Sequence, residues 1–335
     1  MALGRVKVRQ FQRAQPLLNS SGADHHITLE DDGEGVRQAF TAGSYVHVCK
    51  AVGMELGTFG VWTAYRGIGE ENAGEAAALV ADLGFGTFWL GGSPRLSAVR
   101  PLLEADASLS VATGIVNVWT YEPEDLAREY SELSPQFGDR LLVGIGIGHP
   151  EATSDYTRPL ASTRAFLEGI DAAPGGWDPI PPDRRALAAL GPKMLDLCRE
   201  RSRGTLTYFV GPNHTRAARE RLGDGPLIAT ELACVLDTDP ESARAAGRRY
   251  AEMYLGLSNY TGNLLRHGFS EDDIANGGSD RLIDTIVPHG TAEDIAAAAR
   301  EHLDAGADHV CLQPVGVRGV PRAQWTALAS ALGLG

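Results

Sequence analysis

The sequence predicts an α/β fold, a TIM (β/α)8 barrel with a helical insertion before the last strand. Two observations support this. From Met54 onward, short apolar strands alternate with helical segments in about eight βα units. Two of the strands also carry glycines, as strands do where their ends open into a site. A doubly wound open sheet has the same alternation, but the first unit lacks a GxGxxG motif followed by an acidic residue.

Residues 1–53 differ from the rest of the chain. They lack sustained apolar periodicity and combine acidic clusters with turn-forming residues. Met54 stands directly before the first clear strand. We therefore expect residues 1–53 to be a loosely structured N-terminal extension, or to follow from an upstream start that the cell does not use. The barrel domain is expected over residues 54–335.

The first half of the barrel domain contains four strand and helix pairs. One helix is rich in alanine, and another is entered through Pro123 at its first turn. The strands are short apolar runs, two of which end in or contain glycines. The expected elements are, in order, strand 56–62, helix 71–83, strand 87–90, helix 95–105, strand 111–118, helix 123–137, strand 140–149 and helix 159–170.

The second half continues the alternation, with one interruption before the last strand. The inserted segment, about 258–288, is interpreted either as a helical cap on the barrel rim or as a lid over the substrate, with Asn263 and Arg266 as polar contacts. The cap is the preferred interpretation. The expected elements are strand 185–190, helix 192–201, strand 206–210, helix 213–222, strand 232–237, helix 240–255, the insertion, helix 295–305, strand 309–314 and helix 322–332.

Composition limits the classes of function. The chain has 335 residues and a net charge of −13, which disfavours nucleic acid or an anionic membrane surface as the main partner. Its four cysteines have no CxxC spacing, no apolar run approaches the ~18 residues of a membrane span, and no secretory signal is recognisable. His25 and His26 have no third ligand spaced to join them, so no metal site is expected. We expect a cytoplasmic enzyme.

Glycines interrupt two of the expected strands. Gly114 lies in the run 109–117, and an absent side chain there would let a large flat group lie against the main chain. Gly144, Gly146 and Gly148 alternate along the next strand. Packing clearances or turns would also explain these glycines. Because a barrel carries its chemistry at the carboxyl ends of its strands, we expect the site there.

The residues at the expected strand ends favour a bound cofactor. They are mostly glycines, hydroxyls, amides, aromatic rings and one histidine, and carboxylates are scarce. Such a set suits a large planar cofactor that carries the chemistry itself, whereas metal-dependent hydrolysis would need His and Asp ligands. The residues expected to wall the substrate pocket are Trp62, Ser93, Trp119, Tyr208 and Gln313, besides Asn263 and Arg266 of the insertion.

Two further features are candidates for specific roles. A helix that starts after Gly191, with Pro192 in its first turn, would direct free N–H groups toward an anion beside Lys193. An ordinary turn with a solvated lysine explains the same residues. His149 ends the glycine-rich strand and is either structural or the catalytic, ring-contacting residue.

Five motifs give the chain a resemblance to a known family. They are Ser110–Asn117, Leu142–His149, Ala188–Met194, Thr207–Val210 and Gly278–Leu282. In these motifs the chain resembles the bacterial luciferase-like superfamily and, within it, the coenzyme F420-dependent oxidoreductases. Members of the superfamily are TIM barrels with an insertion that bind FMN or the deazaflavin F420 at the strand ends. They often carry a non-prolyl cis peptide in the third strand, which here would join Gly114 and Ile115.

The resemblance implies an oxidoreductase that transfers a hydride between coenzyme F420 and a small organic substrate. The alternatives are an FMN-dependent monooxygenase, a non-catalytic flavin-binding barrel and a metal-dependent hydrolase. The resemblance also implies that Gly191–Lys193 bind the phosphate of the cofactor. It implies that Gly146, Gly148 and His149 line the edge of the cofactor ring. The cofactor-binding residues are then Thr113, Gly114, Ile115, Val116, Asn117, Gly146, Gly148, Ala189, Leu190, Gly191, Pro192, Lys193 and Met194.

The chain departs from the family at the second strand. Several deazaflavin dehydrogenases place Asp-His at its end, where the histidine assists hydride transfer, and this chain has Gly92-Ser93. That difference disfavours an alcohol-oxidising mechanism based on such a histidine and leaves His149 as the titratable replacement nearby. The sequence names neither the substrate nor the direction of transfer, and a homodimer stays an open expectation.

Overall fold

The computed structural model describes residues 54–335, except 154–155 and 173. The expectation of a loose extension over residues 1–53 therefore concerns a segment outside the described residues. The strands of the described part are β1 (Phe59–Thr63), β2 (Thr87–Gly91), β3 (Ser110–Gly114), β4 (Val116–Asn117), β5 (Leu141–Gly146), β6 (Arg185–Ala188), β7 (Gly204–Thr207), β8 (Leu227–Cys234) and β9 (His309–Pro314).

The strands form one closed, parallel sheet. Their order is β3-β2-β1-β9-β8-β7-β6-β5-β4, and the pairing of β3 with β5 closes it. β3 and β4 follow one another directly along the chain and together make one strand of the barrel. The predicted TIM barrel is therefore confirmed. Because every pairing is parallel, the carboxyl ends of all strands meet at the same end of the barrel.

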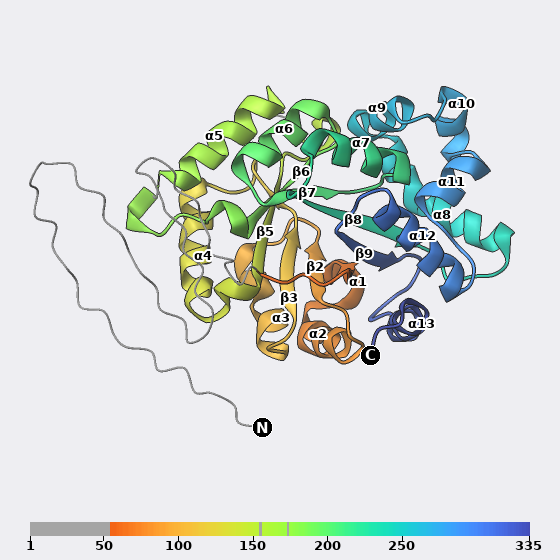
Figure 1. The fold of residues 1–335 in the computed structure, drawn as a ribbon, viewed down its shortest axis with the longest axis horizontal. Helices are drawn as coiled ribbons and strands as arrows, with labels where there is room; N and C mark the ends of the chain where they lie inside the picture. The colour runs from red at the N-terminus through yellow and green to blue at the C-terminus, as the bar shows by residue number, and fades with distance from the viewer. Residues whose placement is uncertain (1–53, 154–155, 173) are drawn as a thin grey trace, which may run out of the picture. The chain divides into compact units, whose positions relative to one another are not determined.

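Helices surround the barrel on the outside (Figure 1). Most strands are followed by one helix that returns the chain to the start of the next strand. The helices are α1 (Tyr65–Ile68), α2 (Ala73–Asp82), α3 (Arg100–Ala105), α4 (Pro123–Phe137), α5 (Pro159–Asp171), α6 (Pro192–Arg201), α7 (Pro212–Leu222), α8 (Pro240–Leu255), α9 (Ser258–Arg266), α10 (Glu271–Ile274), α11 (Asp280–Ile286), α12 (Ala292–Asp304) and α13 (Arg322–Leu332).

The helical insertion before the last strand is confirmed. α9, α10 and α11 lie between α8 and α12 in the sequence and group beside α8 at one side of the barrel (Figure 1). They share a hydrophobic core with the residues after β7, in which Phe209 packs among tyrosines of α8 and α9. The insertion is thus packed onto the barrel through an aromatic cluster at the end where the strands finish.

Two of the predicted strands are misplaced. We expected a strand over 232–237 from its apolar run, but β8 begins at Leu227 and ends at Cys234. The prediction missed the first part of the strand because two buried polar residues, Thr230 and Glu231, interrupt its apolar pattern. The strand expected to end at residue 210 stops at Thr207, and Phe209 has a φ of 55°, outside the β region.

The barrel interior is filled by side chains at its amino end. Trp89 is fully buried there and packs with small residues of the other strands such as Ala112 and Ala229. Trp89 Nε1 donates a hydrogen bond to His309 Nε2 at 2.9 Å, and His309 Nδ1 lies 2.8 Å from the Gly57 carbonyl oxygen. Packed side chains thus close this end and leave the other end for a cavity.

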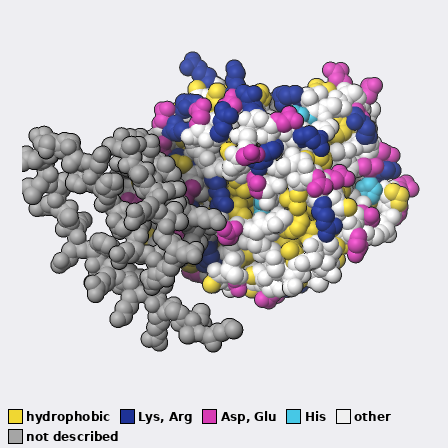
Figure 2. Space-filling view, viewed as in Figure 1, with side chains coloured by type: hydrophobic (Ala, Val, Ile, Leu, Met, Phe, Trp, Pro, Cys, Tyr) yellow, Lys and Arg dark blue, Asp and Glu magenta, His cyan; other side chains and the backbone are white. Residues whose placement is uncertain are grey.

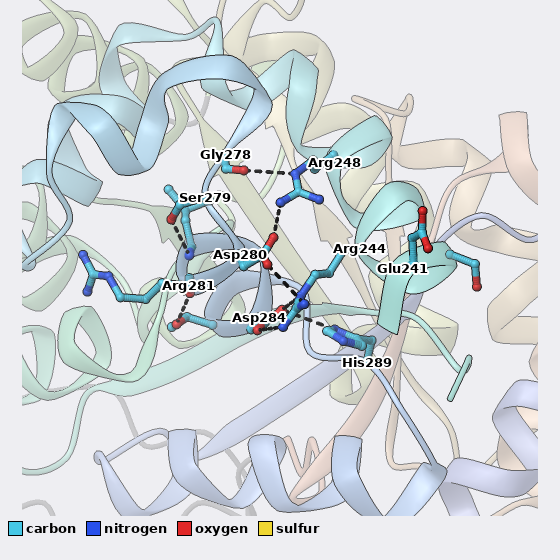
Figure 3. Close-up of polar contacts among 12 residues, drawn as sticks. Glu241, Arg244, Arg248, Gly278, Ser279, Asp280, Arg281, Asp284 and His289 are labelled. Carbon is cyan, nitrogen blue, oxygen red and sulfur yellow. Dashed lines mark hydrogen bonds and ion pairs between the residues drawn. The ribbon is translucent and has the colours of Figure 1, made fainter. Parts of the chain in front are cut away.

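A polar cluster joins the insertion to α8 (Figure 3). Arg244 Nε and Nη2 donate to the two carboxylate oxygens of Asp284 on α11 at 2.8 and 2.7 Å. Arg248 donates to the Gly278 carbonyl at 3.0 Å and pairs with Asp280. The motif Gly278–Leu282, one of the five that carry the family resemblance, therefore anchors α11 to α8.

Charges of both signs are interspersed on the face of the molecule shown in Figure 2, with hydrophobic side chains between them. Neither sign forms a continuous field on that face. Among the helices that the structure describes, none is long and apolar enough to cross a membrane.

Candidate active site

A cavity of about 450 Å³ lies at the carboxyl end of the barrel. The loops that follow β1 to β7 wall it, together with α8 and α9. Its volume falls in the range of small-molecule sites. The predicted site residues that line it are Trp62, Ser93, Gly114, Ile115, Asn117, Gly146, Gly148, His149, Ala189, Leu190, Gly191, Met194 and Tyr208.

Several predicted residues support the cavity wall from behind. Thr113 is fully buried, and its hydroxyl donates to the Gly144 carbonyl at 2.9 Å. Val116 is also fully buried in the core. Trp119 Nε1 donates to the Ile147 carbonyl at 2.6 Å. Gln313 Oε1 accepts a hydrogen bond from the Tyr208 hydroxyl at 2.9 Å. These side chains position residues of the cavity without lining it.

Asn263 and Arg266 are not brought to this cavity. Asn263 lines a separate hollow of about 340 Å³ between the start of α7 and the insertion. Arg266 Nη1 donates to Asn263 Oδ1 at 3.1 Å, and Arg266 lines a further hollow beside α6 and α7. Of the insertion, Asn259 and Tyr260 face the cavity instead, at the start of α9. The two residues expected as lid contacts, Asn263 and Arg266, therefore lie about one to two turns after the residues of α9 that face the cavity.

The flat group that lies against Gly114 belongs to the protein itself. A Cβ atom at Gly114 would overlap the six-membered ring of Trp62, and one at Gly91 would lie 2.7 Å from Trp62 Cζ2. We expected the missing side chain to leave space for a cofactor ring, whereas Trp62 occupies that space. The peptide between Gly114 and Ile115 is cis, as the resemblance implied.

The glycines of β5 and the loop after it permit close approaches to the neighbouring strand. A Cβ atom at Gly144 would overlap the Thr113 carbonyl oxygen, and one at Gly146 would lie 2.8 Å from the side chain of Ile115. Gly148 has a φ of 66°, in the left-handed region that favours glycine. These glycines therefore bring the bulge at Ile115 against β5 and shape one wall of the cavity.

His149 follows Gly148 at the cavity edge and contacts the insertion. Its Nδ1 donates to Asn259 Oδ1 at 3.2 Å, since an amide oxygen can only accept. Its ring centre lies 5.2 Å from that of Tyr260. Burial lowers the pKa of His149 below its usual range, which outweighs the hydrogen bond to Asn259. The neutral ring thus offers Nε2 as an acceptor at neutral pH.

The start of α6 meets the geometric requirements of an anion site. Gly191 precedes the helix with extended backbone and no side-chain cap, and nothing lies within 4 Å of the place where its Cβ would be. Gly191 and Met194 line the cavity, while Pro192 and Lys193 are exposed beside it. Pro192 has no N–H and the Met194 N–H donates to the Gly191 carbonyl at 3.0 Å, so the Lys193 N–H and the Lys193 ammonium are the groups available to a phosphate that reaches out of the cavity.

Reasoning from the sequence missed several residues of the cavity. Tyr254 and Tyr260 line it, as do Arg66 and Met253. Tyr250 and Tyr254 are four residues apart on α8, a spacing that places both on the same face of a helix and was the available signal. The other three follow from the course of the chain around the rim, for which the sequence holds no motif.

A closed parallel barrel with a glycine-walled cavity at its carboxyl end is the architecture of a TIM-barrel enzyme with a small-molecule site. The model of the luciferase-like monooxygenase family matches residues 54–317, which is most of the chain. The chain belongs to this family and is a luciferase-like oxidoreductase.

Relatives and solved structures agree with this assignment. The chain is 24% identical to the 5,10-methylenetetrahydromethanopterin reductase of Archaeoglobus fulgidus, over 71% of this chain and 88% of that protein. It shares the fold of the coenzyme F420-dependent tetrahydromethanopterin reductase of Methanopyrus kandleri, with a TM-score of 0.66 and 16% identity over 82% of this chain and 98% of the other.

An FMN-containing structure has the same fold. It is the oxygenating constituent of 3,6-diketocamphane monooxygenase from Pseudomonas putida, in complex with FMN, with a TM-score of 0.58 and 12% identity over 81% of this chain and 95% of the other. Proteins that share this fold therefore include one that depends on F420 and one that binds FMN. Within the described residues, no three His, Cys, Asp or Glu side chains gather in an arrangement that could hold a metal ion.

Proposed function

We propose that this protein transfers a hydride between coenzyme F420 and a small organic substrate. The observation that carries the proposal is the cavity that runs from the Ile115 bulge to the exposed start of α6. A long cofactor with a flat ring and a phosphate-bearing tail needs these two ends. The relatives named as methanopterin reductases support F420 as the partner.

The residues present fit such a group. The ring would lie against the apolar wall made by Ile115 and the glycines of β5, next to His149. The phosphate would be bound by the backbone N–H and the ammonium of Lys193 at the start of α6. The bound cofactor would supply or accept the hydride, and the chain would orient the ring, exclude water and place polar groups around the substrate.

The charge of the cavity narrows the substrate class. Among the described residues that line it, Arg66 is the only lysine or arginine, and none is an aspartate or glutamate. These residues offer a partner to a neutral or anionic group and none to a cationic one. We therefore propose a neutral or anionic small molecule that carries an unsaturated, hydride-accepting centre.

An FMN-dependent monooxygenase is the second candidate, favoured by the fold shared with the FMN-bound oxygenating protein. Titration of the protein with F420 and with FMN, followed by quenching of cofactor fluorescence, separates the two. The proposal expects saturable binding of F420 and at least tenfold weaker binding of FMN. Tighter binding of FMN would favour the monooxygenase, and binding of neither cofactor would contradict both candidates.

A further inference from the structure

Glu231 is a carboxyl group buried inside the barrel beneath the cavity. It is 1% exposed and lies two residues after Ala229, which belongs to the interior layer, so its side chain points to the inside of the barrel. Its partners in the described structure are the Phe209 N–H and the Tyr250 hydroxyl, each at 3.4 Å. It has no cationic partner among the described residues.

Three tyrosine hydroxyls connect Glu231 to the cavity. The Tyr250 hydroxyl donates to that of Tyr208 at 2.8 Å, and the hydroxyls of Tyr208 and Tyr254 are 2.9 Å apart. Tyr208 donates in turn to Gln313 Oε1 at 2.9 Å. Tyr208 and Tyr254 both line the cavity. A continuous path of hydrogen-bonding groups therefore runs from the buried carboxyl to the cavity wall.

Counting hydrogens shows which form of Glu231 the path requires. Each tyrosine has one hydrogen to donate, and Tyr250 donates its hydrogen to Tyr208 at the shorter distance. An ionised Glu231 would then face only the oxygen lone pairs of Tyr250, which it cannot pair with. A protonated Glu231 donates to those lone pairs and satisfies every hydroxyl in the path. Tyr250 lies 2.8 Å from the Tyr208 hydroxyl and 3.4 Å from Glu231 Oε1, so the shorter contact favours the arrangement with a neutral carboxyl.

We propose that Glu231 is a proton store for the cavity and that its proton reaches the substrate through Tyr250 and Tyr208. The Glu231 O–H bond breaks as an O–H bond forms on Tyr250, the Tyr250 proton moves to Tyr208, and the Tyr208 proton moves to a basic atom of the substrate. Each oxygen keeps its electron pair, so one proton is delivered and Glu231 is left as a carboxylate. A hydronium ion from the solvent that enters the empty cavity gives its proton to Tyr208, and the reverse path returns a proton to the Glu231 carboxylate and leaves a water molecule.

This inference rests on the proposed function, because reduction of an unsaturated centre needs one proton besides the hydride. Glu231 does not touch the cavity and is a positioning residue, while Tyr208 is the donor at the wall. The neighbours agree with a neutral carboxyl, because burial raises the pKa of Glu231 to about 8. The titratable groups that face it carry no positive charge and are Tyr208, Tyr250, Tyr254, Tyr260, Cys234 and Cys311.

The chain contains a matched control. Glu129 on α4 is 5% exposed and, like Glu231, has a tyrosine partner, since its Oε2 accepts from the Tyr121 hydroxyl at 2.7 Å. Arg95 pairs with Glu129, and these hydrogen bonds hold the pKa of that carboxyl below its usual range in spite of burial. Two buried glutamates with the same kind of partner are thus expected in opposite protonation states.

Infrared spectroscopy of the cofactor-free protein tests the store directly, through the C=O stretch of protonated carboxyl groups. At pH 7 we expect a band that is lost in Glu231→Gln and kept in Glu129→Gln, and that titrates with a midpoint near pH 8. A glutamine at residue 231 can still donate to Tyr250, so the fold should be retained. A spectrum of Glu231→Gln equal to that of the wild type at pH 7 would overturn the proposal.

Two tyrosine variants test the path. In Tyr208→Phe, the Tyr250 hydrogen loses its acceptor and turns to Glu231, which stabilises the carboxylate and should lower the midpoint by about one pH unit. In Tyr250→Phe, the protonated carboxyl loses its hydrogen-bond acceptor, so its C=O band should move to a higher frequency. Tyr121→Phe should leave both the midpoint and the band unchanged. A midpoint that does not move in Tyr208→Phe would show that the path is broken and would overturn the relay.

The rate of hydride transfer by the enzyme with bound, reduced F420 provides a kinetic test. Menadione serves as the quinone that accepts the hydride. Glu231→Gln and Tyr250→Phe should each slow a single turnover by about 100-fold, in the range of general acid catalysis, with unchanged affinity for F420. The double variant should be no slower than either single variant, because both act on one path. Glu129→Gln should match the wild type. An unchanged rate in Glu231→Gln would overturn the relay. If the wild type does not oxidise reduced F420, the proposed function is contradicted, and the infrared spectra then decide whether Glu231 stores a proton.

Discussion

The contact of Trp62 with Gly114 explains why residue 114 has no side chain. The Trp62 indole lies over Gly114 and Gly91, 5.1 Å from the ring of Tyr208, and forms part of the cavity wall. The sequence places a glycine at the right point of the right strand, but it holds no information on which ring fills the space. A local pattern identifies a close approach, and only the fold identifies the partner.

This contact makes a prediction for Gly114→Ala. The added methyl group meets a buried ring, so overpacking should lower the free energy of unfolding by about 1–3 kcal/mol, measured by urea denaturation. The near-ultraviolet circular dichroism of tryptophan should also change. Gly191→Ala is the control, because nothing lies within 4 Å of its added Cβ, and its effect should stay below about 0.5 kcal/mol. Equal stability of the two variants would contradict the packing described here.

The buried histidines predict a loss of stability in acid. Burial lowers the pKa of His309 to about 4, from an ordinary value of 6.5. The unfolded chain therefore binds a proton on this residue that the folded chain refuses, and stability falls as the pH drops from about 6.5 toward 4. His302, with its pKa lowered by burial to about 4, acts in the same direction.

The contribution of His309 can be isolated by His309→Gln, since a glutamine can accept from Trp89 and donate to the Gly57 carbonyl. Between pH 7.5 and pH 4.5, the wild type should lose about 2–3 kcal/mol more than this variant, at about 1.4 kcal/mol per pKa unit. Urea unfolding at the two pH values measures the difference. Parallel losses in both proteins would contradict a neutral, buried His309.

At the scale of elements, the sequence predicted what local chemistry determines. The helices 123–137, 240–255 and 322–332 have the predicted bounds, and a proline opens the first two. The strand β8 was misplaced because Glu231 interrupts its apolar run, and that residue is the one with a functional proposal. A carboxyl inside a buried strand breaks the pattern for the same reason that it can store a proton, namely that it lies where a charge is unfavourable.

The start of α6 predicts how strongly one charge contributes to cofactor binding. Lys193→Ala should weaken F420 binding by about 1 kcal/mol, or roughly fivefold, because an exposed ammonium contributes at the lower end of charge-assisted hydrogen bonds. The salt dependence of binding should also decrease. Arg199→Ala, in the last turn of the same helix, should bind F420 as the wild type does. Equal affinities of all three proteins would place the phosphate elsewhere.

The polar cluster between α8 and α11 predicts a modest structural role. Asp284→Ala removes both hydrogen bonds of a two-point contact with Arg244. The side chain of Asp284 is 36% exposed and that of Arg244 is 30% exposed. Solvent screening should therefore limit the loss in unfolding free energy to about 1 kcal/mol. Glu241→Ala on α8 is the control and should change stability by less than about 0.5 kcal/mol. Thermal melting at low and high salt should show the Asp284→Ala difference shrinking as salt rises.

At the scale of the whole molecule, the barrel and the end that holds the cavity could be predicted. Alternating strands and helices determine the architecture, and parallel strands bring all their carboxyl ends to the same edge, so most strand-end residues meet in the cavity. The insertion could not be treated this way. Its position in the sequence is clear, but Asn259 rather than Asn263 faces the cavity, because the docking of α9 depends on aromatic contacts distant in sequence.

We propose that F420 binds in the cavity at the carboxyl end of the barrel. Fluorescence titration with F420 tests this binding most directly. It compares the wild type with two variants in which an alanine is replaced by phenylalanine. Ala188 lines the cavity, so Ala188→Phe should fill it and abolish binding while the melting temperature stays close to that of the wild type. Ala297→Phe, on the exposed face of α12, should bind F420 at one site with wild-type affinity. Tight binding by Ala188→Phe, or no binding by the wild type, would contradict the claim.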